Sequence, residues 1–295
     1  MGDHIIKATT AGGVRAFAAI TTNLAQEARV RHDCSPVAAA GLGRTMTGAL
    51  LMAVNLKTDE SITIRIAGNG PLGEIVADAH ASGIVRGYVK NPHVDLPLRG
   101  TKLDVGTAVG AGQIYVTRFT NMKQPFTGSA ELVSGEIAED ITNYLFVSDQ
   151  TPSSVALGVL VQTDLAVGAA GGFMVQALPN ADDEVLSKIE KNIETMPPVS
   201  QLISEGSDAG GIINLIFAGL PITLHEEIPV EFRCPCSYER IQDVLVSLGS
   251  EEIEDIITVD GQAEISCHFC GEKYQFNKTD LENVMTLIRE KSAEK

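Results

Sequence analysis

The sequence predicts an α+β protein with a mixed sheet and helix N-terminal core over residues 1–178, a helical linker over 179–225 and a small C-terminal domain over 226–295. Alternating apolar and polar residues, which are typical of strands, concentrate in the first part. Segments with helical spacing interrupt them without a regular alternation, which disfavours a βαβ repeat. After residue 178, Gly and Pro break up short helical segments, and the chain becomes acidic from about residue 226.

The core is expected to begin with a strand over Val14–Thr21 and a helix over 23–31. Asn23 and Gln26 have the spacing of a helix N-cap and its partner. Pro36 should open a long apolar helix, because proline suits the first helical turn.

The stretch from Pro36 to Leu56 is apolar enough to be weighed as a membrane span. It contains Arg44 and Asn55 and is rich in Gly and Ala, so a buried central helix is the better interpretation. The N-terminus has no apolar signal-peptide core. We therefore expect no membrane association and a cytoplasmic location, where thiols stay reduced.

From Ser61 to Ile66 the residues alternate between polar and apolar, which predicts a strand. Turn signals of the hairpin kind follow at Asn69-Gly70 and at Ala81-Ser82-Gly83. Ser134–Val147 carries apolar residues at helical spacing. Further strands are expected near residues 84–89, 113–119, 129–133, 155–162 and 166–177.

The run Gly68-Asn-Gly70-Pro-Leu-Gly73 matches the Gly-x-Gly-x-x-Gly pattern of dinucleotide-binding loops. That function needs a helix at this point, and Pro71 and the strand-like Glu74–Ala77 argue against one. A hairpin turn is the better interpretation. The sequence also contains no serine nucleophile elbow, P-loop or His-Glu-x-x-His motif.

The linker opens with a turn at Pro179–Asp183, and an apolar stripe on a helix then runs from Val185 to Met196. Pro197-Pro198 ends this helix, and a short apolar helix follows that ends near Gly219. The segment has the character of a connector that must lie on another surface to be stable. On sequence alone, however, an ordinary pair of packed helices is the better interpretation.

The last segment contains 7 Lys or Arg and 16 Asp or Glu, giving a net charge of −9. A helix is expected over Ile241–Leu248, a hairpin turn at Asp260-Gly261, and a capping box at Thr279 and Glu282 before a final helix. The segment is too short for a good core of its own, so a bound metal is a plausible stabiliser.

Four of the five cysteines lie in this segment, as Cys234-Pro-Cys236 and Cys267-His-Phe-Cys270. Four thiolates form a soft tetrahedral ligand set whose usual occupant is zinc; an iron–sulfur cluster is the less favoured alternative. Each pair is also close enough along the chain to form a local disulfide under oxidation. Spacing alone leaves a structural zinc knot and a redox switch both open.

The fifth cysteine, Cys34, has His32 and Asp33 beside it, but a buried structural cysteine is the commoner case. An enzyme in the core with a structural zinc site depends only on Cys34 and the glycine-rich turn. The net charge of −16 and the absence of Trp disfavour nucleic acid as a partner. A nucleic-acid-binding zinc ribbon is disfavoured by the charge of the last segment.

Two stretches of the chain carry the cysteine pairs, Glu231-Phe-Arg-Cys-Pro-Cys-Ser-Tyr-Glu-Arg240 and Ile265-Ser-Cys-His-Phe-Cys-Gly-Glu-Lys-Tyr-Gln-Phe276. Their sequences show a resemblance to the 33-kDa heat shock protein family of redox-regulated bacterial chaperones. It extends to core motifs at Gly43-Arg-Thr45, Arg65–Gly73 and Gly87–Pro92. It covers essentially the whole chain, in the order core, linker helices and zinc domain.

The resemblance implies a protein that is not an enzyme but an ATP-independent holdase. In the reduced, inactive state, Cys234, Cys236, Cys267 and Cys270 would hold one Zn²⁺. Oxidation would form the Cys234–Cys236 and Cys267–Cys270 disulfides, release zinc, unfold the small domain and loosen the linker. The apolar surface so exposed would bind unfolding client proteins, and the oxidised protein would form a homodimer.

Overall fold

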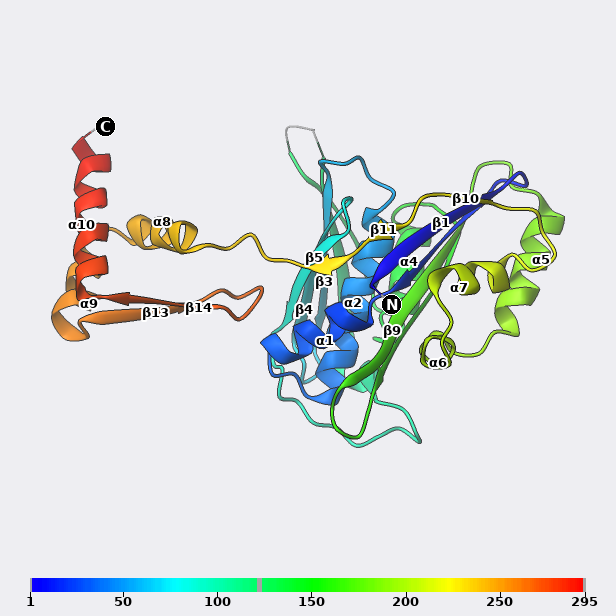
Figure 1. The fold of residues 1–295 in the computed structure, drawn as a ribbon, viewed down its shortest axis with the longest axis horizontal. Coiled ribbons are helices and arrows are strands. Elements are labelled where there is room, and N and C mark those ends of the chain that lie inside the picture. Colours follow the sequence, from blue (N-terminus) through cyan, green and yellow to red (C-terminus); the bar gives the residue numbers. More distant parts are fainter. Residues whose placement is uncertain (1, 121–123, 294–295) are drawn as a thin grey trace. The chain divides into compact units, whose positions relative to one another are not determined.

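The computed structural model describes residues 2–120 and 124–293 and has the predicted α+β class (Figure 1). The chain divides into two compact units, Met1–Arg233 and Cys234–Lys295. Among the described helices, none combines the length and the apolar character needed to cross a membrane.

The first unit contains two six-stranded sheets. The first sheet has the order β10-β1-β2-β9-β8, and β11 also pairs with β1. All of its pairings are antiparallel. Its strands are β1 (His4–Thr10), β2 (Val14–Ile20), β8 (Ser153–Val161), β9 (Val167–Ala177), β10 (Thr223–Leu224) and β11 (Ile228–Pro229).

The second sheet has the order β12-β5-β4-β3-β6-β7, and only the β12–β5 pairing is parallel. The strand predicted at 129–133 begins earlier, at Phe126, because it pairs with β6 along its length. The strands of this sheet are β3 (Ser61–Gly68), β4 (Glu74–His80), β5 (Ile84–Val89), β6 (Gly112–Phe119), β7 (Phe126–Glu131) and β12 (Glu231–Phe232).

The apolar helix α2 (Pro36–Ala53) lies against both sheets and is buried along almost all of its length, as the sequence predicted. Glycines allow this double contact. A Cβ at Gly41 would lie 3.0 Å from Ile75 of β4, and one at Gly43 would lie 3.0 Å from Val159 of β8. Because α2 has no side chain at these points, each sheet approaches its backbone closely. The remaining helices of this core are α1 (Thr22–Arg31), α3 (Val105–Val109) and α4 (Ala138–Val147).

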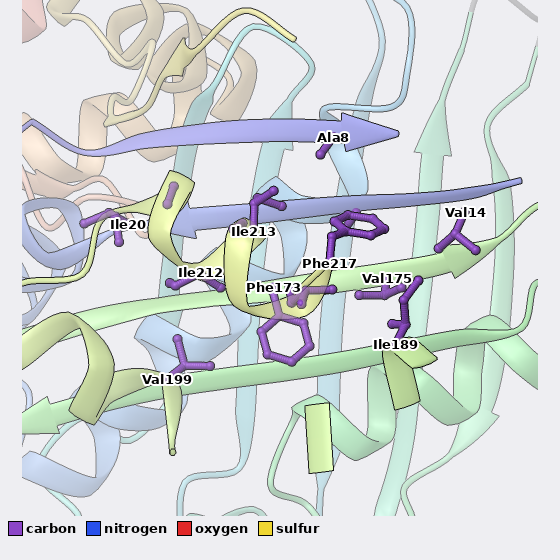
Figure 2. Close-up of a cluster of buried hydrophobic side chains, with 14 residues drawn as sticks. Ala8, Val14, Ile20, Phe173, Val175, Ile189, Val199, Ile212, Ile213 and Phe217 are labelled. Atoms are coloured by element: carbon purple, nitrogen blue, oxygen red, sulfur yellow. The ribbon is translucent and has the colours of Figure 1, made fainter. Parts of the chain in front are cut away.

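The predicted helical linker forms α5 (Asp183–Glu194), α6 (Val199–Ser204) and α7 (Ala209–Ile216). All three helices pack on the first sheet through one apolar cluster, which includes Phe173 of β9, Ile189, Val199 and Phe217 (Figure 2). The linker therefore lies on a sheet surface, as an amphipathic connector requires, and it belongs to the same compact unit as the core.

The second unit contains α8 (Tyr238–Leu248), α9 (Ser250–Val259), the hairpin β13 (Gln262–Ser266) and β14 (Lys273–Asn277), and α10 (Lys278–Ala293). A small core holds it together, with Leu245, Ile253, Phe276 and Leu281 among its most buried members. The turn expected at Asp260-Gly261 does not close the hairpin; it joins α9 to β13.

Two predicted helix caps are wrong. Asn23 lies inside α1, where its backbone and side-chain amides both donate to Asp3, and Gln26 accepts from the Val167 amide. At the start of α10 the capping residue is Asn277 instead of Thr279: its side chain accepts from the amides of residues 279 and 280, while Asp280 accepts from the Asn277 amide. At the start of α1 the Asp3 carboxylate accepts from the free backbone amides, and at the start of α10 the Asn277 side chain does so, in place of the predicted caps.

Candidate metal centre

The first cysteine pair lies in an extended segment between β12 and α8. Cys234 and Cys236 are separated by Pro235, which restricts the backbone between them. Ser237 then caps α8 by accepting from the Arg240 amide. The helix start therefore fixes the chain direction immediately after the second sulfur.

The second pair forms the loop of the β13–β14 hairpin. The Cys267 amide donates to the Glu272 carbonyl, and the Gly271 amide donates to the Cys267 carbonyl, both at 2.8 Å. Gly271 has φ +72°, a left-handed conformation that glycine adopts without strain. The five-residue register of β13 and β14 thus places the sulfurs of Cys267 and Cys270 on one tight turn.

These two segments bring all four sulfurs within 4.8 Å of one another. The Cys234 and Cys267 sulfurs are 3.8 Å apart, and the Cys236 and Cys270 sulfurs are 3.4 Å apart. A tetrahedral zinc ion with Zn–S bonds of about 2.3 Å holds its sulfurs about 3.8 Å apart. The donor set and its spacing could therefore hold one metal ion, and the sulfur chemistry fits zinc.

Tyr274 is a part of the site that the sequence did not identify. Its hydroxyl donates to the Cys236 sulfur at 3.1 Å, from the strand that follows the second cysteine pair. Such a donor orients a ligand and tunes its basicity. The sequence did hint at this position, because Tyr274 and Phe276 alternate with polar residues and so share the more buried face of β14. His268, by contrast, is not in the group of described side chains close enough to share the ion.

Burial raises the pKa of both the Cys236 and Cys270 thiols, although Cys236 is also stabilised as a thiolate by Tyr274. A buried thiol favours its protonated form unless a cation lies beside it. Metal binding to these sulfurs therefore requires loss of their protons, and it couples the site to the folding of the unit.

Cys34 lies in the other unit, between α1 and α2, and is 3% exposed. Burial raises its pKa to about 12, so it is protonated at neutral pH and is a weak nucleophile. The glycine-rich loop at 68–73 is followed by strand β4, with no helix to bind a phosphate. Neither Cys34 nor the glycine-rich loop therefore supports an enzyme active site in the core.

Comparisons with known proteins cover nearly the whole chain. A family model described as Hsp33 protein matches residues 3–277. The chain is 48% identical over 293 residues to the 33 kDa chaperonin of Desulforamulus reducens, covering 99% of this chain and 100% of that protein. It is 47% identical over 286 residues to the 33 kDa chaperonin of Bacillus subtilis, covering 96% and 98%. The crystal structure of the Thermotoga maritima 33 kDa chaperonin superimposes with a TM-score of 0.91 at 36% identity, covering 97% and 99% of the two chains.

Proposed function

This chain belongs to the Hsp33 family, and on that premise we propose that it is a redox-regulated, ATP-independent holdase chaperone. In the reduced protein the four clustered cysteines hold one Zn²⁺ and the chaperone is inactive. Oxidation forms the Cys234–Cys236 and Cys267–Cys270 disulfides and releases the zinc. A cytoplasmic location fits this cycle, because the thiols must be reduced at rest.

One observation carries the proposal: the four sulfurs converge within 4.8 Å although 30 residues separate the two pairs. The pairs join the start of the second unit to its hairpin, so a metal there holds distant parts of a small unit together. Among the described residues, the hydrophobic cluster of that unit has six buried members, a small core for which a bound metal would supply a large share of the stability.

The proposed consequence of zinc loss extends to the linker, residues 179–225. In the reduced protein α5, α6 and α7 cover apolar residues of β1, β2 and β9. The linker packs on the 1–178 core but acts as a separate functional part, distinct from that core and from the 226–295 switch domain. If it loosens after oxidation, the cluster shown in Figure 2 becomes available to non-native clients and to a second copy in a homodimer.

A pair of matched variants tests the proposal. Cys236→Ser removes one ligand, and Cys34→Ser removes the one cysteine outside the cluster. We expect the wild type and Cys34→Ser to bind one zinc per chain, to release it on peroxide treatment and then to suppress aggregation of a heat-denatured reporter protein. Cys236→Ser should bind zinc weakly and lose redox control. Wild-type protein that releases zinc without gaining anti-aggregation activity would contradict the proposal.

A further inference from the structure

Strand β8 is the last strand of the first sheet, and no other strand in the described part of the chain pairs with its outer side. Its nine residues, Ser153–Val161, include no charged residue and no proline. Proteins usually protect an edge strand with lysine, proline or a bulge, because an open edge pairs with other chains. Here the only irregularity is a register shift at its end, between Leu160 and Val161.

The hydrogen-bond pattern identifies which β8 residues point outward. The Ala177 amide donates to the Pro152 carbonyl, so residues 152 and 177 form a hydrogen-bonded pair. Such pairs recur at every second residue of an antiparallel ladder, so positions 154, 156, 158 and 160 bond to β9. The backbone groups of Ser153, Val155, Leu157 and Val159 therefore point away from the sheet.

The pairing of β9 with β2, on its other side, leads to the same assignment of inward and outward residues. The Leu178 amide donates to the Gly13 carbonyl, so the even residues of β9 bond to β2. The odd residues of β9 are then the ones that face β8. Hence Val155, Leu157 and Val159 offer six backbone donors and acceptors that no described residue uses.

A groove of about 510 Å³ follows this edge, and every residue from Val155 to Val161 lines it. Its other walls are the loop at Leu98–Leu103, the start of α4 and the start of α6 at Pro198–Ser200. The charged groups in the lining are Arg44, Lys102 and Glu139, so the groove lacks the strong negative charge of the whole chain.

We propose that this groove binds an extended segment of a non-native polypeptide, which adds to β8 as a further strand. The inference rests on the proposed holdase function and names a client-binding surface for it. Backbone pairing recognises any extended chain regardless of its side chains, which a chaperone with many clients needs.

The test variant is Val155→Pro. Proline removes the outward amide of residue 155 and leaves the bonds of 154 and 156 to β9 intact, as edge strands tolerate. Val155→Thr is the matched control, because it keeps both the amide and the side-chain shape. The probe is a fluorescein-labelled seven-residue peptide of alternating Val and Thr, and its binding to the oxidised protein is followed by fluorescence anisotropy. We expect Val155→Pro to weaken binding about tenfold or more and Val155→Thr to change it less than about threefold.

Amide hydrogen exchange in the wild type tests the same inference without a mutation. The amides of Val155, Leu157 and Val159 should exchange rapidly in the free protein and slow down when the peptide is added, whereas those of Ala156 and Gly158 are protected throughout. Unchanged exchange at the three outward amides at saturating peptide would overturn the inference. So would protection of these amides that grows with protein concentration alone, because the occupant would then be a second copy.

The aggregation assay separates this inference from the proposed function. If oxidised wild type and oxidised Val155→Pro suppress aggregation equally well, the holdase function stands and the β8 site is wrong. If the oxidised wild type does not suppress aggregation, the holdase function fails, and with it the client-binding role of the groove.

Discussion

Oxidation of the cysteine cluster should unfold the second unit, Cys234–Lys295, and leave the core of the first unit folded. The perturbation is peroxide treatment of the zinc-loaded protein, followed by removal of the released zinc. The prediction depends on which sulfurs pair, because the structure places the Cys234–Cys267 and Cys236–Cys270 sulfurs as close together as ligands of one ion. The sulfur positions therefore permit disulfides within each cysteine pair or between the two pairs.

The magnitudes favour unfolding more strongly for disulfides within each cysteine pair than for disulfides between the two pairs. A structural zinc ion contributes about 10–16 kcal/mol of folding free energy. A disulfide that closes a loop of three or four residues restores only about 1.5–2 kcal/mol, whereas one that bridges residues 33 or 34 apart restores about 4 kcal/mol. A unit spanning 234–295 has a total stability of about 3–9 kcal/mol. Two local disulfides thus leave a deficit of at least about 6 kcal/mol, which is comparable with the whole stability of the unit.

Hydrogen exchange, followed by mass spectrometry of peptic peptides, measures the unfolding of the second unit directly. Peptides from β13, β14 and α10 should be protected in the reduced, zinc-loaded protein and should exchange fully within seconds after oxidation. Peptides from β2 and β9 should keep their protection in both states. Persistent protection of the β13–β14 hairpin after complete zinc loss would refute the reasoning, and it would indicate disulfides that join the two motifs.

Three further predictions concern the first unit. Asp140 is fully buried and accepts from four backbone amides, those of residues 133, 134, 135 and 137. Asp140→Ala would leave these amides without an acceptor, so it should lower the free energy of unfolding, measured by chemical denaturation, by about 3–5 kcal/mol. A Cβ at Gly68 would lie 1.9 Å from the Val109 carbonyl oxygen, so Gly68→Ala should cost about 2 kcal/mol or more, whereas Gly2→Ala, which meets nothing within 4 Å, should leave the melting temperature unchanged. Because burial raises the pKa of Cys34 to about 12, its thiol stays protonated from pH 6 to 9, and iodoacetamide should label it only in urea; rapid labelling of the native protein at pH 8 would contradict this.

Local patterns predicted the elements whose signal lies within a few consecutive residues. The alternation of Ile62, Ile64 and Ile66 identified β3, and the apolar run after Pro36 identified α2 as a buried helix. Strands β10, β11 and β12 were not predicted, because each has two residues and exists only by pairing with β1 or β5, far away in the sequence. Strand β1 was missed for a different reason: it forms a hairpin with β2, which follows it directly, but its residues His4–Thr10 do not alternate between apolar and polar.

The candidate site shows the same limit. Cysteine spacing identified the four sulfurs as one ligand set, but it placed a hairpin between the two pairs. In the structure the second pair is itself the hairpin loop, and two helices, α8 and α9, precede it. Gly271 marks the true hairpin turn, because a residue in the left-handed conformation closes it. Gly261 has a similar conformation but follows α9, and this is why a hairpin turn was wrongly predicted there. Tyr274 is a partner of Cys236 only through the register of β13 with β14, which spacing does not encode.

Redox activation of the chaperone can be tested in one peroxide titration, with zinc release, free thiols and suppression of reporter aggregation followed on the same samples. We expect all three to change together, with one zinc released and four thiols lost per chain as anti-aggregation activity appears. Full activity in the zinc-loaded, reduced protein, or complete zinc release and thiol loss without activity, would contradict it.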